Sequence, residues 1–185
     1  MEQYSWAACR IVEDLAAIPC EEARRLYLET GGRHFRAQLA AMGVNGALRE
    51  EAARRFEEAK LPILEAARPG PLVLERVEKL RRAGLLVAVS TNNECSLVGR
   101  LGWLRDLVDL VLCHDPDKGL EKGLPHLRVL ESLGYRPCEI VFIGDSDYDL
   151  EVYRPLGVRV VRSRGLWDPR DSAVEAVLEM IDHGA

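Results

Sequence analysis

The sequence lacks the features of a secreted or membrane-spanning protein. No apolar run approaches the roughly 20 residues that a helix needs to span a bilayer, and no signal peptide opens the chain. The cysteines are widely spaced and form no C-x-x-C pair. We therefore expect reduced thiols in a cytoplasmic protein. The five residues concerned are Cys9, Cys20, Cys95, Cys113 and Cys138.

The chain is also short of positive charge. Its 25 lysines and arginines face 30 aspartates and glutamates, which gives a formal net charge of -5. Nucleic acids and anionic membrane surfaces are polyanions, so neither is an expected partner. Hydrophobic residues make up 48% and charged residues 30% of the 185 residues, as in a soluble globular protein. Small soluble molecules are the expected partners.

The first third of the chain contains no strand-like pattern. Residues 3–67 are rich in Ala, Glu, Leu and Arg, and glycines at 31–32 and between 43 and 46 divide them into about four helices. Two prolines and a glycine at 68–71 then interrupt the helical pattern. We expect an all-α domain over 1–67 and a hinge over 68–71.

After the hinge, expected helices and strands alternate. Such alternation predicts an α/β domain over 72–185, with right-handed crossovers and a three-layer, Rossmann-like parallel sheet. The expected strands are 85–90, 107–113, 140–143 and 158–161, and the expected helices are 72–83, 95–102, 123–134, 148–156 and 171–182.

A short apolar run at 140–143 ends in a cluster of carboxylates. A continuous apolar run fits a strand that is buried on both faces. Parallel sheets bind their ligands at the carboxyl ends of their strands, where Asp145 and Asp149 follow this run. Their hard oxygen atoms suit a divalent cation such as Mg²⁺. The sequence therefore predicts a metal site at Asp145 and Asp149.

Carboxylates at this spacing also occur in calcium-binding loops and in helix caps. A calcium-binding helix-loop-helix needs Gly at its sixth position and Glu at its twelfth, where this chain has Leu150 and Leu156. The calcium loop is therefore disfavoured. A solvated turn in which Asp147 or Asp149 caps the next helix stays open at this point.

Polar side chains also follow the expected strand at 85–90. Ser90, Thr91, Asn92 and Asn93 place hydroxyl and amide groups beside the free N–H groups of a helix N-terminus, which is a phosphate-binding arrangement. The same residue types are ordinary helix caps. Lys122 stands just before the expected helix at 123–134, although a single lysine is usually a surface residue.

Two arginines of the helical domain are further candidates. Arg33 and Arg36 follow a Gly-Gly turn, and their charges suit an anionic substrate. The alternative is an exposed loop whose arginines pair with nearby glutamates.

Together, these motifs resemble those of the haloacid dehalogenase (HAD) superfamily. Thr91, or otherwise Ser90, matches the second motif, which binds the transferring phosphoryl group, and Lys122 matches the third. Asp145 and Asp149 match the fourth motif, which holds magnesium. Residues 22–35 resemble the helical cap of the phosphoglycolate phosphatase-like branch. The resemblance implies a Mg²⁺-dependent phosphatase that acts on a small phosphorylated metabolite, with residues 1–67 as its cap.

One family motif is missing from the sequence. Members carry an apolar strand ending in Asp-x-Asp-Gly-Thr, whose first aspartate attacks phosphorus, whereas this chain opens within the expected first cap helix. An apolar run ending in Asp115-Pro116-Asp117 resembles the motif superficially, but its order in the chain places it toward the sheet edge. The resemblance therefore implies an α/β core that lacks its central first strand.

An empty central position would leave backbone hydrogen-bonding groups without partners. Either the strands that end near Thr91 and Asp145 pair directly, or a partner chain donates a strand, or the natural protein carries residues upstream of Met1. We favour upstream residues, and we note that an unfilled sheet favours self-association.

Three functions are compatible with a parallel α/β core that carries these carboxylates. The expected function is that of a phosphatase-like protein that is inactive or impaired in this form, because no carboxylate nucleophile is present. The alternative is a pseudophosphatase, a phosphate- and metal-binding or regulatory module without turnover. A response-regulator receiver is disfavoured, because its acidic pair comes first and its lysine last.

Overall fold

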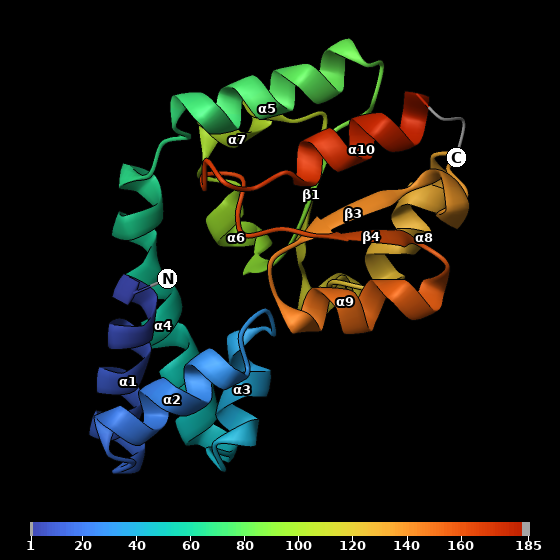
Figure 1. Ribbon diagram of the computed structural model, residues 1–185. Helices are drawn as coiled ribbons and strands as arrows, with labels where there is room; N and C mark the ends of the chain where they lie inside the picture. Colours follow the sequence, from blue (N-terminus) through green and yellow to red (C-terminus); the bar gives the residue numbers. More distant parts are fainter. Residues whose placement is uncertain (1, 183–185) are drawn as a thin grey trace. The chain divides into compact units, whose positions relative to one another are not determined.

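The computed structural model describes residues 2–182 (Figure 1). The chain divides into two compact units, Met1–Ala67 and Arg68–Ala185. The first unit is entirely helical, and the second contains all of the strands found in the described residues. Each unit has its own hydrophobic core.

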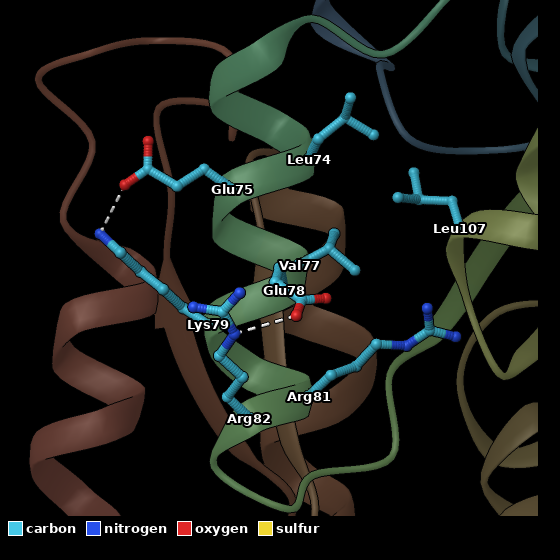
Figure 2. A pocket seen from close by; sticks show the side chains of 8 residues that line it. All are labelled: Leu74, Glu75, Val77, Glu78, Lys79, Arg81, Arg82 and Leu107. Carbon is cyan, nitrogen blue, oxygen red and sulfur yellow. Dashed lines mark hydrogen bonds and ion pairs between the residues drawn. The ribbon is translucent and has the colours of Figure 1, made fainter.

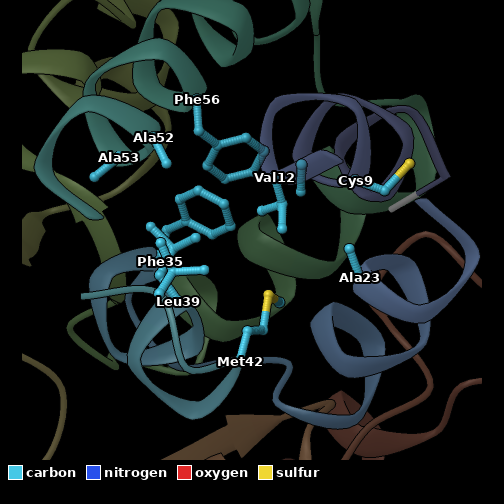
Figure 3. Packing of buried hydrophobic residues seen from close by; sticks show 11 residues of the cluster. Cys9, Val12, Ala23, Phe35, Leu39, Met42, Ala52, Ala53 and Phe56 are labelled. Carbon is cyan, nitrogen blue, oxygen red and sulfur yellow. The ribbon is translucent and has the colours of Figure 1, made fainter. Parts of the chain in front are cut away.

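Four helices make up the first unit, as the glycine positions predict. They pack with α1 against α2 and α4, and with α3 against α4. Phe35 and Phe56 lie at the centre of their core with ring centroids 4.0 Å apart, and Val12, Leu39 and Ala52 surround them (Figure 3). The helices are α1 (Glu2–Ala16), α2 (Cys20–Glu29), α3 (Phe35–Ala41) and α4 (Gly46–Ala66).

In the second unit, helices and parallel strands alternate, which confirms the α/β class. The strands are β1 (Ala88–Glu94), β2 (Leu110–His114), β3 (Val141–Gly144) and β4 (Arg159–Arg162). The helices are α5 (Pro71–Arg82), α6 (Cys95–Val98), α7 (Gly102–Leu107), α8 (Leu124–Ser132), α9 (Asp147–Tyr153) and α10 (Ala173–Asp182). Short 3-10 helices span Pro116–Lys118, Pro137–Glu139 and Arg154–Leu156.

The strands form two separate two-stranded sheets. β1 pairs in parallel with β2, and β3 pairs in parallel with β4. Within residues 2–182, β1 and β3 are not paired with each other. Direct pairing of the strands near Thr91 and Asp145, one of the three ways in which the sheet could close, is therefore wrong. Each of these two strands keeps one edge without a neighbouring strand among the described residues.

Helices cover both faces of the β3–β4 sheet, which gives the expected three layers (Figure 1). Val141 and Ile143 of β3 pack against Leu80 of α5 and against α10. Phe142, which points to the opposite face, packs with Leu127 of α8 and with α9. The alternation follows from the two-residue repeat of a strand, and it explains why the whole run is apolar.

The expectation of reduced thiols is wrong for four of the five cysteines. Cys9 is bonded to Cys20, and Cys95 is bonded to Cys113, whereas Cys138 is free and exposed. The paired residues are 11 and 18 positions apart in sequence. Cys9 and Cys20 are brought together by the contact between α1 and α2, and Cys95 and Cys113 by the pairing of β1 with β2. The spacing of the cysteines in the sequence does not reveal this proximity.

None of the helices in the described part of the chain is long and apolar enough to cross a membrane.

Candidate functional site

The polar residues after Val89 lie on a bulge of β1. Ser90 is in register with Leu112 of β2, and the next register pair is Glu94 with His114. Three residues of β1, Thr91 to Asn93, therefore stand opposite the single residue Cys113. The extra residues cannot all pair with β2, and a bulge of this kind redirects side chains at the end of a strand.

Internal hydrogen bonds fix the shape of this bulge. The Thr91 hydroxyl oxygen accepts hydrogen bonds from the backbone N–H and the side-chain amide of Asn93, both at 3.1 Å. Asn92 Oδ1 accepts a bond from the backbone N–H of Lys122 at 3.0 Å. The bulge is thus connected directly to the segment that carries the predicted lysine.

A buried histidine anchors the start of the bulge. His126 Nε2 lies 3.1 Å from the carbonyl oxygen of Cys113, and His126 Nδ1 lies 2.8 Å from Ser90 Oγ. The carbonyl can only accept, so Nε2 carries the proton and Nδ1 accepts from the Ser90 hydroxyl. Ser90 Oγ then accepts from the Tyr153 hydroxyl at 2.6 Å.

The environment of His126 favours its neutral form. The side chain is fully buried, and burial lowers its pKa below the ordinary 6.5, with the positive charge of Lys122 acting in the same direction. The bond to Cys113 opposes this change. Burial likewise raises the pKa of Tyr153, whose ring stacks on Phe142 of β3 with centroids 4.0 Å apart. Both groups are therefore uncharged near neutral pH.

Lys122 forms an ion pair with Asp149. Its Nζ lies 2.7 Å from Asp149 Oδ1, and the two side chains are only 13% and 3% exposed. The next residue, Gly123, has a φ of 101°, a conformation that side chains rarely adopt, and it lies just before α8. This turn brings the lysine close to both the β1 bulge and the start of α9.

Asp149 also completes a capping box at the N-terminus of α9. Its Oδ2 accepts a hydrogen bond from the backbone N–H of Ser146, and the Ser146 hydroxyl accepts one from the N–H of Asp149, both at 3.2 Å. Gly144 makes this packing possible, because a Cβ there would lie 2.6 Å from Asp149 Cβ. The helix-capping role that the sequence left open for Asp149 thus exists, and the carboxylate binds Lys122 in addition.

Asp145 follows β3 directly and is exposed. Mg²⁺ is commonly bound through one or two carboxylates together with water and phosphate oxygens. Asp145 suits such a role, and each oxygen of Asp149 has a second lone pair beyond the one used for its hydrogen bond. Among residues 2–182, no group of three or more His, Cys, Asp or Glu side chains is placed to hold a metal ion. A role for Asp145 and Asp149 in holding Mg²⁺ stays a prediction.

The two arginines predicted to bind substrate belong to the helical unit. Arg36 Nε lies 2.9 Å from Glu50 Oε2 of α4 in a partly exposed ion pair, and Arg33 is exposed in the turn between α2 and α3. The pairing of Arg36 with a glutamate corresponds to the alternative expected for an exposed loop. A role for Arg33 and Arg36 in substrate binding stays a prediction.

Three residues near Lys122 were not predicted from the sequence: His126, Ser146 and Tyr153. Lys122 precedes α8, and the non-helical Gly123 separates it from the helix that carries His126, so helical spacing does not signal their proximity. The Ser146-x-x-Asp149 spacing has the form of a capping box. Nothing in the sequence indicates that Tyr153 reaches Ser90.

A separate groove of about 550 Å³ runs along α5 (Figure 2). Leu74, Val77 and Leu107 supply its apolar surface. Its charged groups include the ion pairs of Glu75 with Lys79 and of Glu78 with Arg82. None of the residues predicted from the sequence to bind ligand lines this groove.

Comparisons by sequence identify no relative. No protein-family model matches the chain, and no curated protein matches its sequence.

Solved structures, in contrast, share the fold over nearly the whole chain. A predicted phosphoglycolate phosphatase from Haemophilus somnus is 18% identical, with a TM-score of 0.63 over 87% of this chain and 77% of its own. A HAD-superfamily hydrolase from Geobacter sulfurreducens is 23% identical, with a TM-score of 0.57 over 97% and 89% of the two chains. CbbY from Rhodobacter sphaeroides in complex with phosphate is 19% identical, with a TM-score of 0.68 over 93% and 83%. The fold that the motif resemblance implies is thus confirmed, because the chain shares its fold with these solved structures.

Proposed function

We propose that this chain is a HAD-like phosphatase whose complete form hydrolyses a small phosphomonoester with Mg²⁺. The observation that carries the proposal is the buried ion pair of Lys122 with Asp149, joined through Asn92 to the bulge after β1. The proposed site thus combines the ammonium group of Lys122 with hydroxyl and amide donors and with carboxylates. These groups follow the carboxyl ends of parallel strands, where α/β proteins bind their ligands. The bound phosphate of CbbY is consistent with this choice of ligand class.

Each proposed role follows from the chemistry of the side chain. Thr91, Asn92 and Asn93 would donate hydrogen bonds to phosphate oxygens, with Ser90 holding the start of the bulge. Lys122 would stabilise the charge that spreads over these oxygens during transfer, and Asp149 would keep the ammonium group in place. Mg²⁺, held by Asp145 and Asp149, supplies further charge neutralisation when bound.

The 185-residue chain by itself is proposed to turn over slowly or not at all. Phosphoryl transfer through the protein needs a nucleophile in line with the leaving group. The Asp-x-Asp-Gly-Thr motif that would supply it is absent from the sequence, and Asp115 of the lookalike is engaged with Lys118 at 2.8 Å. β2, which precedes Asp115, pairs with β1 and has no pairing with β3 among the described residues.

The split sheet supports the idea of a preceding strand. Leu85 and Val87, just before β1, share a hydrophobic cluster with Val141 and Ile143 of β3, yet no described strand pairs with the remaining edge of either β1 or β3. Val141 and Ile143 are each only partly buried, whereas strands of a complete parallel sheet are buried on both faces. An additional parallel strand would cover these edges and would deliver the missing carboxylate.

A pseudophosphatase is the second candidate. It is favoured by the engagement of both Asp149 oxygens in bonds that hold the fold together, one to Lys122 and one to Ser146. In that case the chain binds phosphate and Mg²⁺ for a regulatory purpose. Under either function, we also propose that the helical unit acts as a cap and that residues 68–71 act as a hinge. The proposed partner is a small phosphorylated metabolite, the proposed route of self-association is through unpaired strand edges, and the proposed location is cytoplasmic.

The test compares the hydrolysis of p-nitrophenyl phosphate, with and without Mg²⁺, by the given chain and by a chain extended with the residues encoded upstream. The proposal predicts Mg²⁺-dependent hydrolysis that rises at least about a hundredfold on extension, the scale of a catalytic group. A Lys122→Met substitution in the extended chain serves as the control and should abolish the gain. An upstream stop codon, or no hydrolysis by the extended chain, would favour the pseudophosphatase.

A further inference from the structure

One disulfide lies directly at the proposed phosphate-binding bulge. Cys113 is the β2 residue that stands opposite Thr91, Asn92 and Asn93, and Cys95 is the first residue after β1. The bond between these cysteines therefore ties the end of the bulge to the strand beside it. The other disulfide, Cys9–Cys20, belongs to the helical unit.

The two ends of the bulge are held in different ways. At its start, Ser90 and the Cys113 carbonyl are bonded to the ring of His126. At its end, the only covalent link to β2 within the described residues is the disulfide to Cys95. Breaking this bond removes the covalent constraint at the end of the bulge, where Glu94 still pairs with His114 of β2, while the hydrogen bonds at its start remain, so the change is local.

The disulfide is accessible to small reagents. Both cysteines are partly buried and line a groove of about 470 Å³ together with Val98, Leu104 and Arg105. Access is one of the factors that determine the rate of thiol–disulfide exchange.

We propose that the Cys95–Cys113 disulfide is a reversible redox switch that fixes the Thr91–Asn93 bulge and thereby sets the affinity for phosphate. The inference rests on the proposed function for the phosphate site itself. Oxidation removes two electrons and two protons from the two thiols and passes them to a small disulfide, which becomes two thiols. A dithiol reductant reverses the step: its thiolate attacks one protein sulfur, and its second thiol then closes its own disulfide.

The structure supplies two backbone reporters of the bulge. The N–H of Asn93 donates to Thr91 Oγ1, and the N–H of Lys122 donates to Asn92 Oδ1. Both amides are protected from hydrogen exchange only while the bulge keeps its shape. Their exchange rates therefore report on the bulge even if no phosphate binds.

The test uses two matched variants of the full chain. Cys9→Ser/Cys20→Ser/Cys138→Ser retains only the disulfide at the bulge, and Cys95→Ser/Cys113→Ser/Cys138→Ser retains only the disulfide of the helical unit. Each is measured by NMR hydrogen exchange and by inorganic phosphate titration, before and after treatment with dithiothreitol. Circular dichroism confirms that both remain folded.

In the first variant, reduction should accelerate exchange of the Asn93 and Lys122 amides about tenfold and should weaken phosphate binding by a similar factor. In the second variant, the reductant should change neither quantity. Unchanged exchange of both amides on reduction of the first variant would overturn the switch. Faster exchange without phosphate binding in either redox state would instead refute the phosphate site, and with it the control of affinity.

Discussion

Lys122 Nζ lies 2.7 Å from Asp149 Oδ1, and both side chains are almost completely shielded from water. Removing two charges from water is costly, and their mutual attraction offsets this cost only when the geometry is good. This pair connects the turn before α8 with the first turn of α9. Its loss should therefore affect both the stability of the fold and the proposed site.

Replacing Lys122 with Met should destabilise the protein, because Asp149 is then left buried without its cation. Breaking a buried ion pair in this way typically costs about 3–5 kcal/mol. Urea denaturation measures the change in the free energy of unfolding. The control is Lys118→Met, which removes an ion pair whose lysine is 74% exposed and should change the free energy of unfolding far less than Lys122→Met does. Equal losses in the two variants would contradict a special role for the buried pair.

Gly144→Ala should also destabilise the second unit, for steric reasons. The new Cβ would lie 2.6 Å from Asp149 Cβ and 2.9 Å from Phe142 Cε1, so these side chains must move. Overpacking of this kind costs about 1–3 kcal/mol. Gly102→Ala is the matched control, since nothing lies within 4 Å of a Cβ at that position. A shift of the urea midpoint for Gly144→Ala alone is the expected result.

Arg76 should be important for the loop that precedes α10. It is 3% exposed, and its guanidinium donates hydrogen bonds to the backbone carbonyls of Leu166, Asp168 and Asp171. Arg76→Met leaves these carbonyls without their donor and should cost about 2–4 kcal/mol in thermal or urea unfolding.

The comparison for Arg76 is Arg82→Met on the same helix. Arg82 forms an ion pair with Glu78 in which the arginine side chain is 78% exposed. Its loss should change the free energy of unfolding by less than about 1 kcal/mol. A loss at Arg76 as small as that at Arg82 would show that the carbonyls find other partners.

His126 should make stability depend on pH in mildly acidic solution. Burial lowers its pKa in the folded state below the 6.5 of the unfolded chain, so the unfolded state binds the proton more readily. Its contribution is complete above pH 6.5 and is lost progressively as the pH falls through the folded-state pKa. Urea midpoints between pH 5 and 8 should fall toward low pH in the natural sequence and less steeply in His126→Gln. Parallel curves would contradict the assignment.

Local patterns in the sequence were enough to predict the elements of both units. Apolar runs and the positions of glycines identified four helices before Ala67 and the alternation of helices and strands after it. These signals are local, so the sequence alone was sufficient. The helix expected over 95–102 is instead two short helices, α6 and α7. Strand β1 extends through Thr91 to Glu94, since pairing of Glu94 with His114 prolongs it beyond its apolar part.

Long-range contacts were harder to predict from the sequence. The disulfides depend on which elements become neighbours, and their spacings in the chain match no known pattern. The motifs located Lys122 and Asp149 separately, but their contact was only implied by the family resemblance. The bond of Ser90 to Tyr153 spans 63 positions and has no local signal.

The most direct test of the central claim is calorimetric titration of the chain with inorganic phosphate in the presence of Mg²⁺, compared with Lys122→Met and Lys118→Met. We predict measurable binding that is weakened at least about tenfold by Lys122→Met, the effect of losing one charge-assisted contact. Lys118→Met should bind as the natural sequence does. No binding, or equal binding by all three proteins, would contradict a phosphate site at Lys122.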